Sequence, residues 1–379
     1  MNLFPMGVNA KIAFVTYPNI CYPGGGQRIF YILASKLKQL GHTTEILTTD
    51  AGPVSTNIKN QLLTEKIQLT ELKHISVITL PFGFRKLMDL FKRNDIIYFE
   101  YWSGGLEACV YLCSKLSNTP VLTAHQTHLS TAASDRHWLI DMTFRILGPR
   151  NIRIGKRIGM QQVVCKQDES EISEWVSRDK IVFLPNGVEL SKFSKGEKEA
   201  VFTVLFISRL VREKGVHLIP EIVTKLEKRI TDFKVVIAGS GPMKPFVEEL
   251  VKTNEKITYL GEVDGEQKSR IFASSHVLMA PTSSETFMIT GIEAMASYTP
   301  VIIFDIPGPI DYVRSGYNGF VAKTLDDFVL RISDVHSMWK ANRASYESML
   351  NNCRVTAEDY DWDSVLIPRL EKILEKMIY

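Results

Sequence analysis

A cluster of cationic side chains follows one apolar run in the second half of the chain. The segment at 208–215 reads SRLVREKG and comes directly after the run FTVLFI. Arg209 can hold two oxygens of a diphosphate, and Lys214 can supply a point charge beside it. The ordinary alternative is a solvated charged loop. Because ligands of α/β sheets bind at the ends of strands, the position favours a binding role.

A glycine-rich segment, PGGGQ at 23–27, follows an apolar run near the start of the chain and opens a helical pattern. Glycines such as Gly25 and Gly26 let backbone N–H groups approach a ligand closely, and a helix N-terminus favours an anion. A flexible turn between strand and helix explains the same residues equally well. The segment matches neither GxGxxG nor the GxxxxGK[ST] of nucleotide triphosphatases.

Two carboxylates, Glu285 and Glu293, lie eight positions apart around an expected helix start. If the helix begins near Met288, Glu293 lies ~7 Å along its axis. Two acceptors at this spacing can hold hydroxyls at the two ends of a nucleotide sugar, with the diphosphate at the helix N-terminus between them. Taken alone, the pair is also explained by a surface acid and an acid that caps a helix.

The elements that must position these groups are short β-branched runs separated by helical patterns such as 27–40 and 104–117. Such runs are typical of parallel strands buried on both faces. The expected strands begin at Lys11, His42, Ser76, Asp95, Pro120, Gln161 and Ile181, and again at Phe202, Lys234, Ile257, Val277 and Pro300.

This alternation, repeated twice, predicts an α/β fold of two doubly wound Rossmann-like domains with a central cleft between them. We expect an N-terminal acceptor-side domain at 1–193 and a C-terminal donor-binding domain at 200–355. The polar stretch 190–200 is the expected linker, and a C-terminal helix at 362–379 is expected to pack back on the first domain.

The composition is that of a globular protein. The 379 residues are 45% hydrophobic and 23% charged, which excludes disorder, collagen and coiled coil. Neither a secretory signal nor a transmembrane run is apparent, and the 5 cysteines form no CxxC pair, so we expect a reduced, cytoplasmic protein. Of the net charge of +3, residues 1–195 carry +7 (23 basic, 16 acidic) and the remainder −4. This asymmetry is too mild for a nucleic-acid binder.

The second half resembles the donor-binding domain of the retaining glycosyltransferases of family four, which have the GT-B fold. The motifs that carry this resemblance occur in order: SRLVREKG, AGSGP at 238–242, YLGEV at 259–263, APTSSETFMITGIEAMA at 280–296, and PVIIFD followed by SGYNGFV at 315–321. The two glutamates match the E-x7-E pattern of that family. LPNGVELSKF at 184–193 matches its interdomain crossover, while the first domain matches more loosely.

The resemblance implies a role for each matching residue. Glu285 would contact the transferred sugar, and Glu293 would hold the ribose hydroxyls. Arg209 and Lys214 would stabilise the departing diphosphate, and His125 would lie beside the sugar. The backbone at Phe287, Met288 and Ile289, together with Gly25 and Gly26, would bind phosphate or sugar oxygens, and Val263 would border the nucleobase.

Three residues or segments depart from the family pattern. Met288 stands where glycine is common, Tyr298 replaces a small residue, and Pro307-Gly308-Pro309 is stiffer than the usual glycine pair. These departures bear on the identity of the donor more than on the reaction.

The resemblance thus implies a retaining transfer of a hexose from a nucleotide-diphosphate sugar to a glycan or lipid-linked acceptor, without metal or other cofactor. A nucleotide-sugar 2-epimerase of the same fold and a non-catalytic transferase-like subunit remain alternatives. Against the latter, a scaffold has no reason to keep charged groups unpaired in a cleft. The DxD pattern at 359–363 is interpreted as helix capping rather than as a metal site. His128 and His137 are expected to have no metal role.

A segment at 85–93, RKLMDLFKR, could bind an anionic membrane. At about 100° per residue, Arg85, Lys86, Lys92 and Arg93 fall on one side of a helix and apolar residues on the other. Phe82 and Phe84 just ahead could enter the headgroup region. A second basic cluster at 150–157 belongs to the same domain. The alternative is an amphipathic helix that packs its apolar face on its own sheet.

Overall fold

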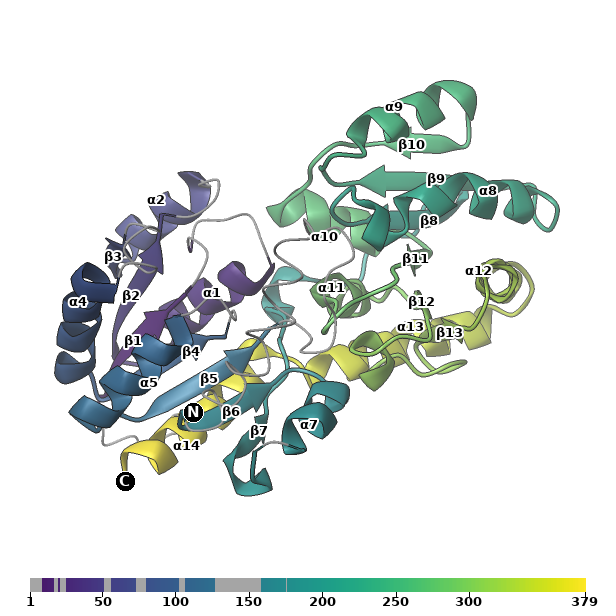
Figure 1. The fold of residues 1–379 in the computed structure, drawn as a ribbon. Helices are drawn as coiled ribbons and strands as arrows, with labels where there is room; N and C mark the ends of the chain where they lie inside the picture. Colours follow the sequence, from purple (N-terminus) through teal and green to yellow (C-terminus); the bar gives the residue numbers. More distant parts are fainter. Residues whose placement is uncertain are drawn as a thin grey trace. The chain divides into compact units, whose positions relative to one another are not determined.

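The computed structural model describes residues 9–16, 20, 25–50, 56–72, 80–101, 106–126, 158–174 and 176–379 (Figure 1). The chain divides into two compact units, one of Met1–Leu184 with Ile367–Tyr379 and the other of Pro185–Leu366. The predicted end of the first domain, residue 193, lies beyond this division. Residues 185–193 belong to the second unit, because Val188 N donates to Tyr360 O and Trp362 N donates to Val188 O.

The first unit contains a parallel sheet in the order β3-β2-β1-β4-β5-β6-β7. Its strands are β1 Lys11–Val15, β2 Thr43–Thr49, β3 Gln68–Leu72, β4 Ile96–Glu100, β5 Val121–His125, β6 Met160–Val163 and β7 Ile181–Phe183. Its described helices are α1 Gly25–Gln39, α2 Thr56–Thr64, α4 Leu80–Arg93, α5 Leu106–Ser117, α7 Lys166–Ser173 and α14 Ile367–Ile378.

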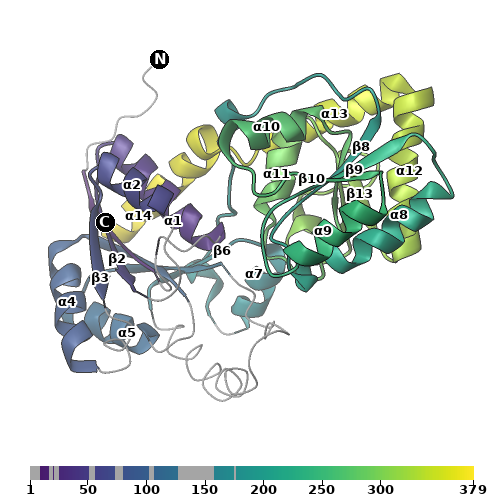
Figure 2. The same ribbon diagram turned by 90° about the horizontal axis from the view of Figure 1, so that it is seen from above.

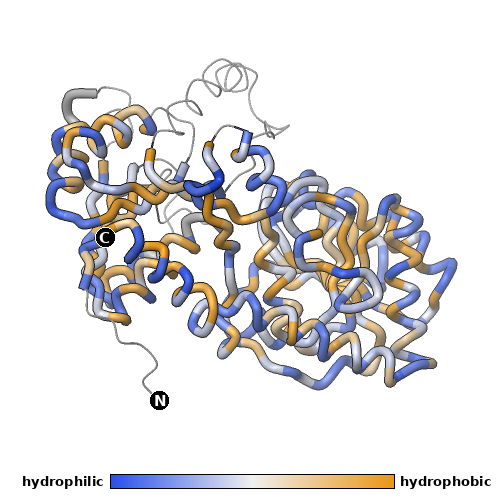
Figure 3. The backbone as a smooth tube through the Cα atoms, turned by 90° about the horizontal axis from the view of Figure 1, so that it is seen from below, coloured by the Kyte–Doolittle hydropathy of each residue, from blue (hydrophilic) through white to orange (hydrophobic). Residues whose placement is uncertain are grey.

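Helices cover both faces of this sheet, which explains why its central strands are apolar throughout. In β1, Ala13 and Val15 pack into a core with α4 and α5. Phe14 faces the opposite side, where its ring centroid lies 5.9 Å from that of Phe30 on α1. Figure 2 shows α1 and α14 on one side of the sheet and α4 and α5 on the other. Figure 3 shows hydrophobic segments in the interior and hydrophilic ones at the outer turns of the chain.

The third strand lies earlier in the sequence than predicted. It is Gln68–Leu72, whereas the prediction placed it from Ser76. Residues 76–79 lie outside the described part, and Leu80 begins α4. Because β3 lies at the edge of the sheet and pairs with β2, three of its five residues are polar, and it lacks the continuous apolar run that marked the other strands.

The apolar face of α4 packs inside the first unit. Leu87, Leu90 and Phe91 are buried in the core shared with β1 and α5, and Phe84 packs against them. Arg93 Nε donates to Glu45 Oε1 of β2 at 2.8 Å. The apolar face and Phe84 are therefore not available for insertion into a membrane. Arg85, Lys86 and Lys92 are exposed.

The second unit contains a parallel sheet in the order β10-β9-β8-β11-β12-β13. Its strands are β8 Phe202–Ile207, β9 Phe233–Ala238, β10 Ile257–Tyr259, β11 Val277–Ala280, β12 Val301–Phe304 and β13 Gly319–Ala322, the last of which was not predicted. Its helices are α8 Ile219–Glu227, α9 Lys244–Thr253, α10 Gly265–Ser274, α11 Ile289–Ala296, α12 Leu325–Ala341 and α13 Arg343–Glu358. Figure 2 shows α10 and α11 on one side of this sheet and α8 and α9 on the other. Each unit is thus doubly wound, and the predicted fold class is confirmed.

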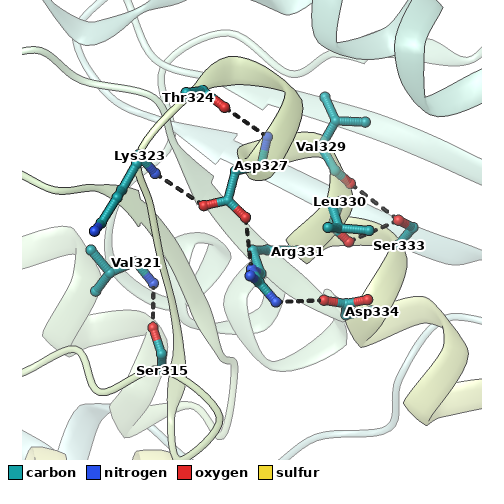
Figure 4. A network of polar contacts seen from close by, with 10 residues as sticks. All are labelled: Ser315, Val321, Lys323, Thr324, Asp327, Val329, Leu330, Arg331, Ser333 and Asp334. Carbon is teal, nitrogen blue, oxygen red and sulfur yellow. Dashed lines mark hydrogen bonds and ion pairs between the residues drawn. The ribbon is translucent and has the colours of Figure 1, made fainter.

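Side-chain capping fixes the start of α12 (Figure 4). Thr324 Oγ1 accepts from Asp327 N at 3.1 Å, and Asp327 Oδ2 accepts from Lys323 N at 3.1 Å. Arg331 then joins Asp327 and Asp334 through its guanidinium. These contacts satisfy N–H groups that a helix start leaves without partners, and they begin α12 directly after β13.

The order of strands reverses between β8 and β11 in the second sheet and between β1 and β4 in the first. The loops that leave two such neighbouring strands turn to opposite faces, which opens a crevice at the carboxyl ends. In the second unit these loops are 208–215 and 281–288, the two segments that the sequence marked for chemistry.

The predicted linker at 190–200 is packed against the second unit rather than flexible. Lys198 Nζ donates to Ser275 O at 2.6 Å, to Thr299 Oγ1 at 2.9 Å and to Tyr298 O at 3.1 Å. Ser275 ends α10, and Tyr298 follows the end of α11. Carbonyls at helix C-termini favour a cation, so Lys198 fastens this segment to two helix ends.

Replacing Lys198 with Met should lower the free energy of unfolding by about 2–3 kcal/mol, because it leaves buried acceptors without a donor. Lys195→Met is the matched control, since Lys195 pairs with Glu347 at the surface. It should cost less than about 1 kcal/mol. Urea unfolding of both variants measures the difference, and equal losses would contradict this role of Lys198.

Candidate active site

The loop after β8 approaches the loop after β11 so closely that a side chain has no room between them. Gly215 has φ +80°, and a Cβ added there would lie 2.1 Å from Pro281 O. The backbones are also joined directly, because Ser283 N donates to Glu213 O at 3.0 Å. This contact places the short helix Arg212–Lys214 against the start of the β11 loop.

An ion pair joins the two loops at this point. Lys214 Nζ donates to Glu285 Oε1 at 2.7 Å and lies 3.4 Å from Ser284 O. The Lys214 side chain is 11% exposed and that of Glu285 is 18% exposed. Arg209 is exposed and forms no ion pair among the described residues. The sequence placed Lys214 and Glu285 in loops after two different strands, and the structure brings their side chains into contact.

The helix α11 begins directly after this pair. Met288, at its N-cap position, has φ 63° and ψ 74°, a left-handed conformation that favours glycine. Tyr312 Oη donates to Met288 O at 2.8 Å and holds this conformation in place. The ring of Phe287 is buried and packs against the rings of Tyr312 and Tyr360, which also contact each other. The first N–H groups of α11, at Ile289 and after it, therefore start at a fixed position beside Glu285.

The second acid, Glu293, is 4% exposed and forms an ion pair with Lys268 of α10. Burial of a carboxylate costs several kcal/mol unless a cation compensates it, and Lys268 supplies that cation. Sequence reasoning missed Lys268, since it lies in no motif that we singled out. Its place one turn into the helix after Val263 is the only signal that could have suggested it. Val263 itself is half-buried in the loop that follows β10.

These contacts correct one argument from the sequence. Lys214, Glu285 and Glu293 are not unpaired charges, because each has an ionic partner. Unpaired charge therefore gives no reason to reject a non-catalytic role. A weaker reason remains, since Arg209, in the same loop as Lys214, is exposed and has no ionic partner among the described residues.

Gly308 supports the backbone of the β11 loop from outside. It has φ +87°, and a Cβ added there would lie 2.6 Å from both Glu285 O and Thr286 O. The segment Pro307–Pro309, which the sequence marked as a stiff departure from the family, therefore packs directly on the residue that pairs with Lys214.

In the first unit, His125 ends β5 and is 5% exposed. Its Nε2 lies 2.8 Å from Gln161 Oε1, and its ring centroid lies 4.9 Å from that of Tyr101. Burial lowers the pKa of His125, so its imidazole is neutral at pH 7. Gly25 and Gly26 form the start of α1, as expected, while Pro23 and Gly24 lie outside the described residues.

The remaining motifs have structural roles or cannot be assessed. Asp361 Oδ2 accepts from Ser364 N at 3.0 Å and from Ser364 Oγ at 2.7 Å, which is the capping predicted for the DxD segment. Within the described ranges, no group of three or more His, Cys, Asp or Glu residues could hold a metal ion. His128, His137 and the basic cluster at 150–157 lie outside the described residues.

Gly308→Ala should destabilise the second unit through a clash with the Glu285–Thr286 backbone. Gly316→Ala is a matched control, because Gly316 also has a positive φ, +79°, but nothing lies within 4 Å of its added Cβ. Both variants carry the cost of an alanine at positive φ, at least about 1–2 kcal/mol, and Gly308 adds to it with ψ −83°, outside the left-handed helical region. Gly308→Ala should lose about 1–3 kcal/mol more in thermal or urea unfolding. Equal losses of unfolding free energy in the two variants would show that the backbone around Gly308 shifts to make room for the added methyl group.

Comparison with protein families gives two matches that together span residues 23–349. The model described as Glycosyltransferase Family 4 matches residues 23–192, and the model described as Glycosyl transferases group 1 matches residues 187–349.

Curated relatives are similar at low identity. An uncharacterized glycosyltransferase of Methanocaldococcus jannaschii is 30% identical over 43% of this chain and 42% of its own length. The GtfA subunit of a UDP-N-acetylglucosamine–peptide N-acetylglucosaminyltransferase of Streptococcus pneumoniae is 29% identical over 40% of this chain and 30% of its own. These matches thus span less than half of either relative. The phosphatidyl-myo-inositol mannosyltransferase of Mycobacterium tuberculosis is 25% identical over 78% of each chain.

Solved structures share the fold over nearly the whole chain. HepE of Anabaena in complex with UDP has a TM-score of 0.77 at 15% identity, with 97% of this chain and 99% of HepE covered. The pneumococcal O-GlcNAc transferase GtfA in complex with UDP and GlcNAc has a TM-score of 0.75 at 13% identity, with 98% and 99% covered. The chain therefore belongs to the family-four glycosyltransferases of the GT-B fold.

Proposed function

We propose that this glycosyltransferase moves a hexose from a nucleotide-diphosphate sugar to a glycan or lipid-linked acceptor and retains the anomeric configuration. The observation that carries the proposal is the contact of Lys214 with Glu285 where the strand order reverses. An exposed Arg209 lies in the same loop as Lys214, and α11 starts four residues after Glu285. The relatives and structural neighbours named for mannosyl and N-acetylglucosaminyl transfer or solved with UDP support a nucleotide-sugar donor.

In this proposal Arg209 and Lys214 stabilise the negative charge that develops on the leaving diphosphate. The backbone N–H groups of Phe287, Met288 and Ile289, around the start of α11, contribute as well, and Gly25 and Gly26 are assigned to phosphate or sugar oxygens. Preorganised donors of this kind contribute about 3 kcal/mol each to transition-state stabilisation. We propose that these groups carry out the reaction without a metal ion.

The two acids have different roles in this proposal. Glu285 contacts the transferred sugar, and Lys214 couples that contact to the leaving group. Glu293 accepts hydrogen bonds from the ribose hydroxyls, and its buried carboxylate forms an ion pair with Lys268. Val263 borders the nucleobase at the carboxyl end of β10. His125 is assigned to the transferred sugar.

An epimerase and a non-catalytic subunit are distinguished by direct assays. Incubation of UDP-sugar without acceptor yields an epimerised sugar if the chain is an isomerase. A thermal-shift panel of UDP-, GDP- and ADP-sugars identifies the donor, because a ligand at 100 times its dissociation constant stabilises by about 2.7 kcal/mol. A subunit without a donor site shows no shift with any of them.

We further propose that the first unit meets an anionic membrane surface through Arg85, Lys86 and Lys92 on the exposed side of α4. Since the apolar face of α4 is buried, the attraction is electrostatic, about 1 kcal/mol per basic residue. In the described residues, no helix is both long and apolar enough to cross a membrane.

Lys214→Ala should lower turnover at least about a hundredfold, an effect of ~2.7 kcal/mol, because the leaving group loses its cation. Lys225→Ala is the control, since Lys225 pairs with Asp326 at the surface. It should keep turnover within about twofold. Steady-state kinetics with the donor found by thermal shift measure both, and turnover of Lys214→Ala within about threefold of wild type would remove Lys214 from the mechanism.

Glu293→Gln should mainly weaken donor binding, because a ribose contact is shared by the ground state and the transition state. Glu285→Gln should mainly lower turnover. Calorimetric titration gives the dissociation constants and initial rates give the turnover numbers. The reverse pattern would show that the donor lies in the opposite orientation.

Replacing all three of Arg85, Lys86 and Lys92 with Ser should reduce co-sedimentation with anionic vesicles at low salt, because the charges that attract the vesicle are removed. High salt screens the same attraction. Arg93 is left in place, since it pairs with Glu45 inside the unit. Wild-type protein should pellet with anionic but not neutral vesicles, and less so at high salt. Equal pelleting with both vesicle types, or no loss in the variant, would favour an acceptor in solution.

A further inference from the structure

Two glutamines follow one another in β6, a buried strand between two others. Gln161 and Gln162 are each 2% exposed, and a buried amide is costly unless it is hydrogen-bonded. Gln161 Nε2 donates to Ile158 O at 2.7 Å, and Gln162 Nε2 donates to Leu184 O at 2.8 Å. Since successive side chains of a strand point to opposite faces, each glutamine presents its oxygen to a different face of the sheet.

The oxygen of Gln161 faces His125. Its amide nitrogen is turned to Ile158 O, so the atom 2.8 Å from His125 Nε2 is Oε1, which can only accept. Nε2 must therefore carry the proton. In a neutral imidazole the other nitrogen, Nδ1, is then a bare acceptor.

The surroundings keep His125 neutral and leave Nδ1 unused. Burial lowers the pKa of His125 against the opposing effects of Gln161 and of the Asp168 charge. His125 Nδ1 has no hydrogen-bond partner among the described residues, and neither has Tyr101 Oη, whose ring packs on the imidazole. Thr123 Oγ1, two residues earlier on the same face of β5, is also without a partner there. In the described part of the chain, the imidazole and two buried hydroxyl groups thus each have a polar atom without a hydrogen-bond partner.

We propose that Gln161 is a positioning residue that fixes His125 as the Nε2–H tautomer, so that Nδ1 accepts a hydrogen bond from a hydroxyl group of the transferred sugar. The tautomer follows from the contacts of Gln161 alone. The identity of the hydroxyl rests on the proposed function. In this arrangement His125 orients the sugar as an acceptor and transfers no proton.

The tautomer is measured on the full chain by NMR of protein labelled with ¹⁵N-histidine, with His125→Ala to assign the signal. Wild type should show a single neutral tautomer protonated at Nε2 at pH 7. Gln161→Met removes the acceptor and should populate both tautomers. Gln162→Leu is the matched control, because it is an equally buried glutamine that contacts Tyr98 instead, and it should leave the signal unchanged. A wild-type ring protonated at Nδ1, or an unchanged tautomer in Gln161→Met, overturns the proposal.

Gln161→Glu provides a second test, which can be made even if Gln161→Met does not fold. A carboxylate at this position favours the imidazolium, in which Nδ1 carries a proton and cannot accept. Turnover should therefore fall at least about tenfold at pH 6.5 and recover as the pH rises through the new pKa of His125. Gln162→Leu should stay within about threefold of wild type at every pH. A loss in Gln161→Glu that is independent of pH would indicate a merely structural role.

The ligand is tested with UDP-glucose, GDP-mannose and the matching nucleoside diphosphates. A nucleotide sugar should shift the Nδ1 resonance of His125, whereas the diphosphate alone should not. Equal shifts with both overturn the sugar contact. If the tautomer is as expected but neither nucleotide sugar binds or reacts, the proposed function is contradicted, and so is the hydrogen bond from the sugar hydroxyl to His125. The role of Gln161 in fixing the tautomer stands in that case.

Discussion

The loop after β8 and the loop after β11 meet with backbone against backbone, and the arrangement of the site follows from this contact. Gly215 leaves no space for a Cβ against Pro281 O, and Gly308 leaves none against Glu285 O. Between these two contacts the β11 loop has little freedom. Lys214 reaches Glu285 because its own loop is held by Gly215, and α11 starts where it does because Tyr312 fixes Met288. A chain that loosened either contact would move the acid, the cation and the helix start together.

The fold could be predicted from the sequence wherever strands are buried on both faces. Continuous apolar runs such as Phe202–Ile207 mark such strands without reference to the rest of the chain. The edge strands β3 and β13 lack this mark, since one is half polar and the other is short and begins with glycine. The role of Lys198 could not be predicted for a related reason. A lysine in a polar stretch looks solvated, and the carbonyls that receive it come from helix ends about 80 and 100 residues away along the chain.

The site was predictable in its residue types but not in its pairings. Their spacing and position in the sequence identified Arg209, Lys214 and the two acids as candidate site residues. The order of strands in the sheet decides which of these side chains come into contact. Lys268 reaches Glu293 only because α10 packs beside α11. The role of Gln161 could not be predicted either, because it depends on the orientation of one side-chain amide and no sequence motif marks it. Local patterns identify groups capable of chemistry, whereas the topology of the sheet selects their partners.

The return of α14 to the first unit makes that unit discontinuous in the sequence. Leu370 and Leu374 are buried there, and Glu371 Oε1 lies 3.4 Å from His42 Nε2, more than 300 residues away along the chain. During synthesis on the ribosome the second unit can therefore fold as one continuous stretch, while the first waits with an apolar surface uncovered until residues 367–379 have emerged. Contacts of such long sequence separation form slowly. The first unit is thus completed only after the second unit has been made, and until then its uncovered apolar surface can aggregate or bind chaperones.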